Sequence, residues 1–174
     1  MVDCIEALAD VVKELLRSKG LVVVGIGNVL RGDDGIGVLI ARKLKKMLRG
    51  LRNVKVVVCE SGLENITHIL MDYKPKHILI IDAVYVEGGE PGDIYVLDIN
   101  DLDYYQSVTT HHIPLKLTLN YLMGHLNTDV TIIGIQVRSV GLGEEMSREV
   151  INAGEYLLTL FRRVVEELDS LDRV

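Results

Sequence analysis

The chain has 174 residues, 48% of them hydrophobic and 25% charged, and a formal net charge of −6. This balance predicts one globular domain over residues 1–174. The acidic net charge argues against nucleic-acid or anionic-membrane partners, which attract an excess of Lys and Arg. No signal-like segment opens the chain and no apolar run approaches the roughly 20 residues that span a bilayer, so a cytoplasmic protein is expected.

Two hydrophobic patterns alternate along the chain. Apolar residues at three- and four-residue spacing predict amphipathic helices, and short continuous apolar runs predict buried strands. In chain order, the expected elements are a helix within 1–20, a strand over 21–24, a helix over 36–48, a strand over 54–59, a helix over 66–73, a strand over 77–81, a strand over 94–97, a helix over 114–126, a strand over 130–137 and a helix over 150–168. The alternation predicts a three-layer α/β/α domain.

Turn residues separate the third and fourth predicted strands. Gly88-Gly89 and Pro91-Gly92 permit a hairpin into the strand over 94–97, which is therefore expected to be antiparallel. A polar loop is expected over 100–110. The two cysteines, Cys4 and Cys59, are too few for a disulfide framework or a thiolate zinc site, and Cys59 is expected in the core.

A glycine-rich, acidic loop follows the first strand. Gly25 and Gly27 suggest a dinucleotide-binding turn, but position 30 is Leu and the pair Asp33-Asp34 would repel a phosphate. Carboxylates at a helix N-terminus can instead receive a cation or transfer protons. They can equally be an acidic cap of the helix, and the loop alone leaves both interpretations open.

A second acid and a histidine could complete a site with this loop. Asp82 ends an apolar strand, and ligands of open α/β sheets bind beyond the carboxyl ends of the strands. If the first and third strands are neighbours, about 4.8 Å apart, Asp82 and the acidic loop face one volume. A histidine of the pair His111-His112, shortly before Pro114, could approach the same rim. An Asp/Asp/His set suits a transition metal, although each residue alone could be structural. These positions are expected to be partly exposed.

The order of several short blocks resembles the hydrogenase maturation endopeptidases, closest to the branch serving hydrogenases of the formate-hydrogenlyase type. The resemblance extends from about Leu21 to Leu168. The blocks are Gly25-Ile26-Gly27-Asn28-Val29-Leu30-Arg31-Gly32-Asp33-Asp34-Gly35-Ile36-Gly37, Ile80-Ile81-Asp82-Ala83, Pro91-Gly92-Asp93, Thr109-Thr110-His111-His112-Ile113-Pro114-Leu115 and Gly134-Ile135-Gln136. Two features depart from the family's pattern: the helix within 1–20 lies outside it, and Ser61 replaces a glycine.

The resemblance implies a mixed five-stranded sheet of order 2-1-3-5-4 with strand 4 antiparallel. It places the family's metal-binding and catalytic residues on Asp34, Asp82 and His111, which leaves Asp33 as a helix cap. The implied reaction removes the C-terminal extension of a [NiFe]-hydrogenase large-subunit precursor. Nickel is carried by that substrate, and no organic cofactor is implied. A Gly-x-Ser-x-Gly elbow is absent from the sequence, which argues against an acyl-enzyme.

Two other functions remain compatible with these residues. One is a metal-dependent hydrolase of small molecules, and the other is a nickel-sensing chaperone that binds the precursor without cutting it. Precursor shortening would distinguish a protease from both. The sequence does not fix the oligomeric state, and a monomer is the default expectation.

Overall fold

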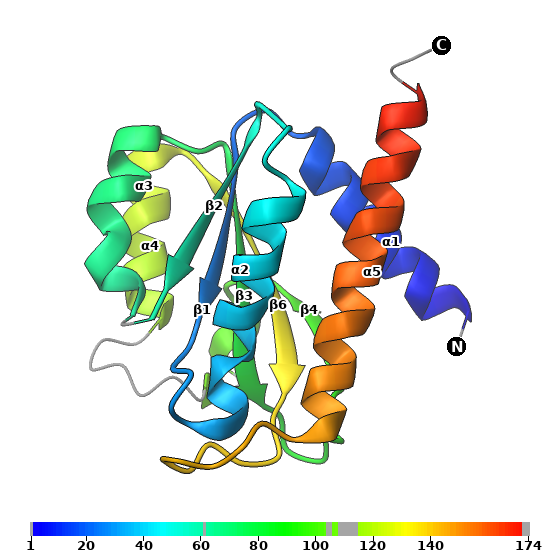
Figure 1. Ribbon diagram of the computed structural model, residues 1–174. Coiled ribbons are helices and arrows are strands. Elements are labelled where there is room, and N and C mark those ends of the chain that lie inside the picture. The colour runs from blue at the N-terminus through cyan, green and yellow to red at the C-terminus, as the bar shows by residue number, and fades with distance from the viewer. Residues whose placement is uncertain (1, 61, 104–105, 108–114, 172–174) are drawn as a thin grey trace.

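The chain folds into a central sheet covered by helices on both faces (Figure 1). The computed structural model describes residues 2–60, 62–103, 106–107 and 115–171. Its elements are α1 (Val2–Arg17), β1 (Leu21–Ile26), the 3-10 turn η1 (Gly32–Gly35), α2 (Ile36–Met47), β2 (Val54–Cys59), η2 (Leu63–Ile66), α3 (Thr67–Tyr73), β3 (His77–Tyr85), β4 (Ile94–Leu97), η3 (Asp101–Asp103), β5 (Gln106–Ser107), α4 (Leu115–Leu126), β6 (Asp129–Gln136) and α5 (Arg148–Leu171).

The sheet confirms the predicted strand order. Its main path runs β2-β1-β3-β6-β4, where β6 is the fifth strand of the sequence-based prediction. The strands β2, β1, β3 and β6 are parallel, and β4 is antiparallel to β6. β1 and β3 are therefore neighbours, as the predicted site requires.

Three details differ from the sequence-based expectation. β3 does not stop at Asp82 but continues to Tyr85, because its pairing with β6 extends as far as Val84 and Gln136. The strand over 94–97 pairs with β6 rather than forming a hairpin with β3. A short strand, β5, lies within the expected polar loop and pairs antiparallel with the end of β3.

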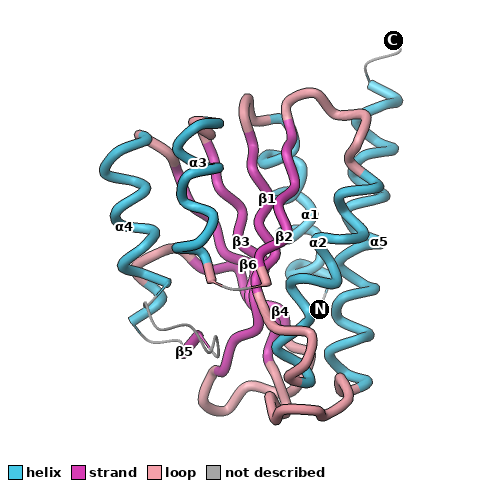
Figure 2. The backbone as a smooth tube through the Cα atoms, turned by 60° about the vertical axis from the view of Figure 1, so that its left-hand side comes forward, coloured by secondary structure: helices cyan, strands magenta, loops and turns pink. Residues whose placement is uncertain are grey.

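Each face of the sheet has its own hydrophobic core. On one face, α1, α2 and α5 pack on the side chains of alternate strand residues such as Leu79 and Ile81. On the other, α3 and α4 pack on Ile78 and Ile80. Figure 2 shows the sheet between these two groups of helices. The alternation of side chains along a strand thus separates the three layers.

The N-terminal helix belongs to this domain. α1 buries an apolar stripe that includes Leu8, Val12 and Leu15, and it lies beside α5. Within the described part of the chain, no helix combines the length and the apolarity needed to cross a membrane.

Two glycines let α2 begin unusually close to the sheet. A Cβ atom at Gly37 would lie 2.3 Å from the carbonyl oxygens of both Ile26 and Ile81. A Cβ at Gly25 would lie 2.1 Å from the carbonyl oxygen of Gly37. The first turn of α2 therefore lies directly over the last residue of β1 and the middle of β3, a position that no larger residue permits.

This close contact makes Gly37 a sensitive position. Gly37→Ala should lower the free energy of unfolding by about 1–3 kcal/mol, because the added methyl group meets two backbone oxygens. Gly124→Ala in α4 is the matched control: a Cβ at this position would have no neighbouring atom within 4 Å, so alanine should stabilise the helix by about 0.5–1 kcal/mol. Urea unfolding of both variants measures the difference, and equal stabilities would contradict the proposed contact.

Candidate active site

The carboxyl ends of β1 and β3 form the point at which the sheet reverses its winding. The chain passes from β1 to β2 on one side, and β3 then returns to pair with the other side of β1. Open α/β sheets bind ligands at such a point, beyond the carboxyl ends of the strands. The loops that follow β1 and β6 both lie at this edge, at the bottom of Figure 1.

Asp34 occupies the turn η1, between β1 and α2, and its side chain is fully buried. The backbone of Asp34 is fixed on two sides. Its N–H donates to the carbonyl of Arg31 at 3.1 Å, and its own carbonyl lies against Gly27, where a Cβ would come within 1.8 Å. Gly27 has φ +145°, so both its conformation and this contact require glycine.

Asp82 lies inside β3 and is also fully buried. It is opposite Gly134 of β6, and one carboxylate oxygen accepts the N–H of Ala83 at 2.9 Å. By strand alternation its side chain shares the face of Ile80, which α3 and α4 cover. The turn η1, which carries Asp34, packs against β3, the strand that carries Asp82.

The expectation of partly exposed positions is wrong for both acids. Asp82 is buried because β3 continues for three residues beyond it. Asp34 is buried because the turn η1 packs against Gly27, which directly follows β1, and against the strand β3. The edge thus holds two carboxylates that are shielded from solvent.

The third predicted residue, His111, lies outside the described residues, as does its neighbour His112. Among the residues that the structure does describe, no group of three or more His, Cys, Asp or Glu side chains forms a metal-binding arrangement. Cys59 is buried in the core, where its thiol donates to the carbonyl of Gly62 at 3.0 Å, as expected for a core cysteine.

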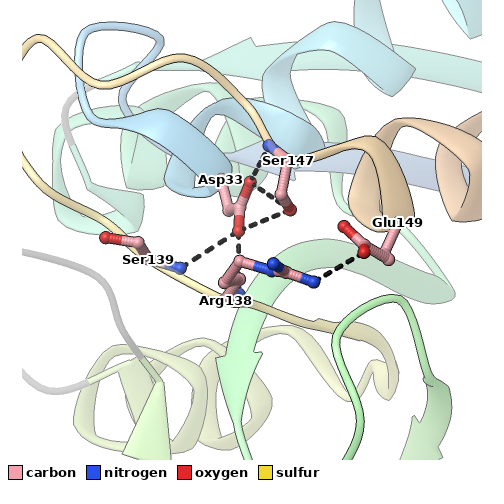
Figure 3. Close-up of polar contacts among 5 residues, drawn as sticks. All are labelled: Asp33, Arg138, Ser139, Ser147 and Glu149. Atoms are coloured by element: carbon pink, nitrogen blue, oxygen red, sulfur yellow. Dashed lines mark hydrogen bonds and ion pairs between the residues drawn. The ribbon is translucent and has the colours of Figure 1, made fainter.

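Asp33 does not cap α2, contrary to the sequence-based expectation. Its buried carboxylate instead accepts hydrogen bonds from the segment between β6 and α5 (Figure 3). One oxygen accepts the N–H of Arg138 at 2.8 Å and of Ser139 at 3.2 Å. The other accepts the N–H of Ser147 at 2.6 Å, and the Ser147 hydroxyl lies 2.9 Å from both oxygens. The guanidinium of Arg138 pairs with Glu149 instead.

A separate cavity of about 510 Å³ lies at the opposite ends of the parallel strands. Its lining includes Glu14, His77 and Asp129, and His77 and Asp129 are the first residues of β3 and β6. Burial lowers the pKa of His77, and the nearby charges of Asp129 and Glu14 partly oppose this shift. Because the cavity lies at the amino ends of the strands, it is separate from the edge that carries Asp34 and Asp82.

Comparison with known proteins identifies the family. A sequence model of hydrogenase maturation proteases matches residues 38–163. The hydrogenase 3 maturation protease of Escherichia coli K12 is 34% identical over 146 residues, covering 82% of this chain and 87% of the relative. The crystal structure of a [NiFe] hydrogenase maturation protease, HycI from Thermococcus kodakarensis, superposes with a TM-score of 0.76 at 32% identity, covering 90% of this chain and 99% of the other.

Fold and sequence thus define a protease with an α/β/α sheet. The chain belongs to the hydrogenase maturation protease family. The solution structure of the E. coli endopeptidase HycI agrees, with a TM-score of 0.70, 30% identity and coverage of 82% and 88% of the two chains.

The lowered pKa of His77 predicts how stability depends on pH. The folded state binds the proton less tightly than the unfolded state, so protonation favours unfolding and stability falls as pH decreases through about 6.5. His77→Gln should remove this part of the pH dependence while keeping a partner for the Thr131 hydroxyl, which lies 2.9 Å from Nε2. Thermal melts of both proteins between pH 8 and 5 measure it. If the melting temperatures of the two proteins changed with pH in the same way, His77 would not be the source of this pH dependence.

Proposed function

We propose that this protease removes the C-terminal extension of a [NiFe]-hydrogenase large-subunit precursor after nickel has been inserted, and that Asp34, Asp82 and His111 recognise the nickel. The observation that carries the proposal is the burial of two aspartates, one within β3 and one in the turn that follows the neighbouring strand β1, at the winding reversal of a maturation protease fold. This is where an open α/β sheet binds its ligand.

The chemistry of the two acids supports a cation as that ligand. Removing a carboxylate from water costs free energy, which a cation and well-placed hydrogen bonds offset. Carboxylate oxygens and imidazole nitrogen are ligands of divalent transition metals. Asp34 and Asp82 supply the oxygens, and a histidine would supply the nitrogen.

The position of His111 in the chain supports its role as the third ligand. It lies four residues before Leu115, the first residue of α4, and Leu115 is buried in the core on the face that α3 and α4 cover. Asp82 points to that same face. In the sequence, His111 thus comes shortly before a helix that packs on the face of the sheet to which Asp82 points.

Nickel in this scheme is part of the substrate. It would arrive in the active site of the precursor, and the three protease residues would complete its coordination. The bound metal would then hold the neighbouring peptide bond at a fixed distance from the protease and polarise its carbonyl group or a water molecule. A precursor without nickel lacks this point of attachment, so the metal content of the precursor decides whether the bond is cut.

Nickel content should control cleavage. The precursor loaded with nickel should lose its C-terminal extension, whereas the same precursor prepared without nickel should remain intact, because its peptide bond is not positioned. Intact-protein mass spectrometry of both samples after incubation gives the answer directly. Equal shortening of both samples would reject recognition through nickel.

The proposed ligands should be indispensable for this cleavage. Asp34→Asn and Asp82→Asn replace an anionic oxygen with little change of shape, and His111→Ala removes a nitrogen ligand, so each should slow cleavage by about 100-fold or more. Asp98→Asn is the control for the two acids. The Asp98 carboxylate also accepts backbone N–H groups, from Asn100 and Asp101, but it follows β4 at the opposite edge of the sheet.

The rates should be compared at a temperature at which all four variants are folded, as checked by circular dichroism. Asp98→Asn should cleave at the wild-type rate. If Asp34→Asn or Asp82→Asn also cleaved at that rate, the ligand assignment would be wrong although the family would still hold.

A further inference from the structure

The ten-residue segment 138–147, between β6 and α5, is attached to the rest of the protein at both of its ends by one side chain. Arg138 and Ser139 at its start and Ser147 at its end all donate to the carboxylate of Asp33. The backbone of Asp33 adds a further contact, because its N–H donates to the carbonyl of Ser139 at 3.1 Å. Figure 3 shows this carboxylate between the two ends of the segment.

Hydrogen bonds hold the two ends of this segment, and Val140 and Met146, close to those ends, are partly buried against the core that α1, α2 and α5 form with the sheet. Most of its middle is exposed, and the side chain of Leu142 is 75% exposed. One backbone hydrogen bond joins the middle to the loop after β1, from Gly143 to the carbonyl of Leu30 at 2.8 Å. A compact surface loop with adjacent ends is an Ω-loop, a type that is frequently functional. Here a buried carboxylate closes the loop.

We propose that Asp33 is a positioning residue for the cleavage reaction: by joining both ends of the 138–147 segment to the turn η1, it fixes the position of Asp34. This inference rests on the proposed function, in which Asp34 contacts the nickel of the precursor. Asp33 itself touches neither the metal nor the substrate in this scheme.

The geometry of η1 explains how one acid can fix the other. Residues of a 3-10 helix follow one another at a third of a turn, so the side chains of Asp33 and Asp34 leave the turn in different directions. The first is held by the 138–147 segment, and the backbone of the second rests on Gly27. A turn of four residues that is fixed on both sides has little freedom to rotate. Releasing Asp33 would free one side.

Asparagine cannot replace Asp33 in this arrangement. Each carboxylate oxygen accepts at least one backbone N–H, from Arg138 and Ser139 on one side and from Ser147 on the other. The amide group of asparagine offers one acceptor and one donor. In either orientation its NH₂ group faces a backbone N–H, so at least one of these hydrogen bonds is replaced by a repulsive contact. Asp33→Asn is therefore a sharp test despite its unchanged size.

The test combines kinetics with hydrogen exchange on the full-length protein. Cleavage of the nickel-loaded precursor is measured for wild type, Asp33→Asn, Ser147→Ala and the control Asp98→Asn, well below the melting temperature of each. Asp33→Asn should lower kcat by about 100-fold, as expected for a displaced catalytic group, with KM changed less than about threefold. Ser147→Ala removes only the hydroxyl and should have a smaller effect in the same direction. Asp98→Asn should match wild type.

Amide exchange provides the readout that is independent of activity. In Asp33→Asn the amides of Arg138, Ser139 and Ser147 should exchange faster, while those of β1 and β3 keep their protection. Unchanged exchange at these amides overturns the proposal whatever the kinetics. A variant that melts at a lower temperature yet keeps the wild-type kcat also overturns it, because Asp33 would then serve stability alone.

The two proposals can fail separately. If wild type does not shorten the nickel-loaded precursor, the proposed function is rejected, and a positioning role in that reaction is rejected with it. If wild type cleaves and Asp33→Asn cleaves at the same kcat, only the positioning role is rejected.

Discussion

The close contact between the start of α2 and the sheet determines where every element of the site lies. Gly37 lies so near the carbonyl oxygens of Ile26 and Ile81 that a methyl group would collide with both. Interiors are packed too densely for such a contact to relax without moving backbone. The turn η1, which ends immediately before α2 begins, is therefore held close to the end of β1. Because no side chain separates the helix from the sheet, the turn that carries Asp34 also packs against β3, the strand that holds Asp82.

Two adjacent acids in that turn have different tasks because they face different surroundings. Asp33 meets backbone N–H groups from a distant segment and takes part in a polar network that holds two loops together. Asp34 is the residue that we propose contacts the metal of the substrate. Buried polar groups that are well satisfied by hydrogen bonds restrict a structure to one arrangement. In a site that must meet a metal at a defined distance, such restriction is directly useful.

The sequence predicts the sheet far better than it predicts the site. Continuous apolar runs and the glycine-rich loop after the first strand indicate the parallel strands, and the family resemblance supplies their order, which the structure confirms. The full extent of β3 is hidden from the sequence because aspartate is rare within strands, whereas pairing with β6 carries the strand past Asp82. The burial of Asp34 and Asp82 also follows from tertiary packing that no local pattern reports.

The role of Asp33 could not be predicted for a related reason. Its partners are more than 100 positions away in sequence, and an aspartate at a helix start is ordinarily taken as a cap. The serine that precedes α5 by one residue, Ser147, gives little warning by itself, since serine is common at helix starts. Only the fold brings the two helix starts together around one carboxylate.

The closure of the 138–147 segment by Asp33 separates the ends of this loop from its middle. Its ends are fixed by backbone N–H groups and one hydroxyl, whereas the exposed middle, including Leu142, contributes little to that closure. Exposed side chains there, such as that of Leu142, can be exchanged without changing the hydrogen bonds that close the loop, because those bonds are made by the backbone N–H groups and the hydroxyl at its two ends. The surface beside the site can thus diverge freely while the site stays constant, which would let one scaffold accommodate differently shaped protein substrates.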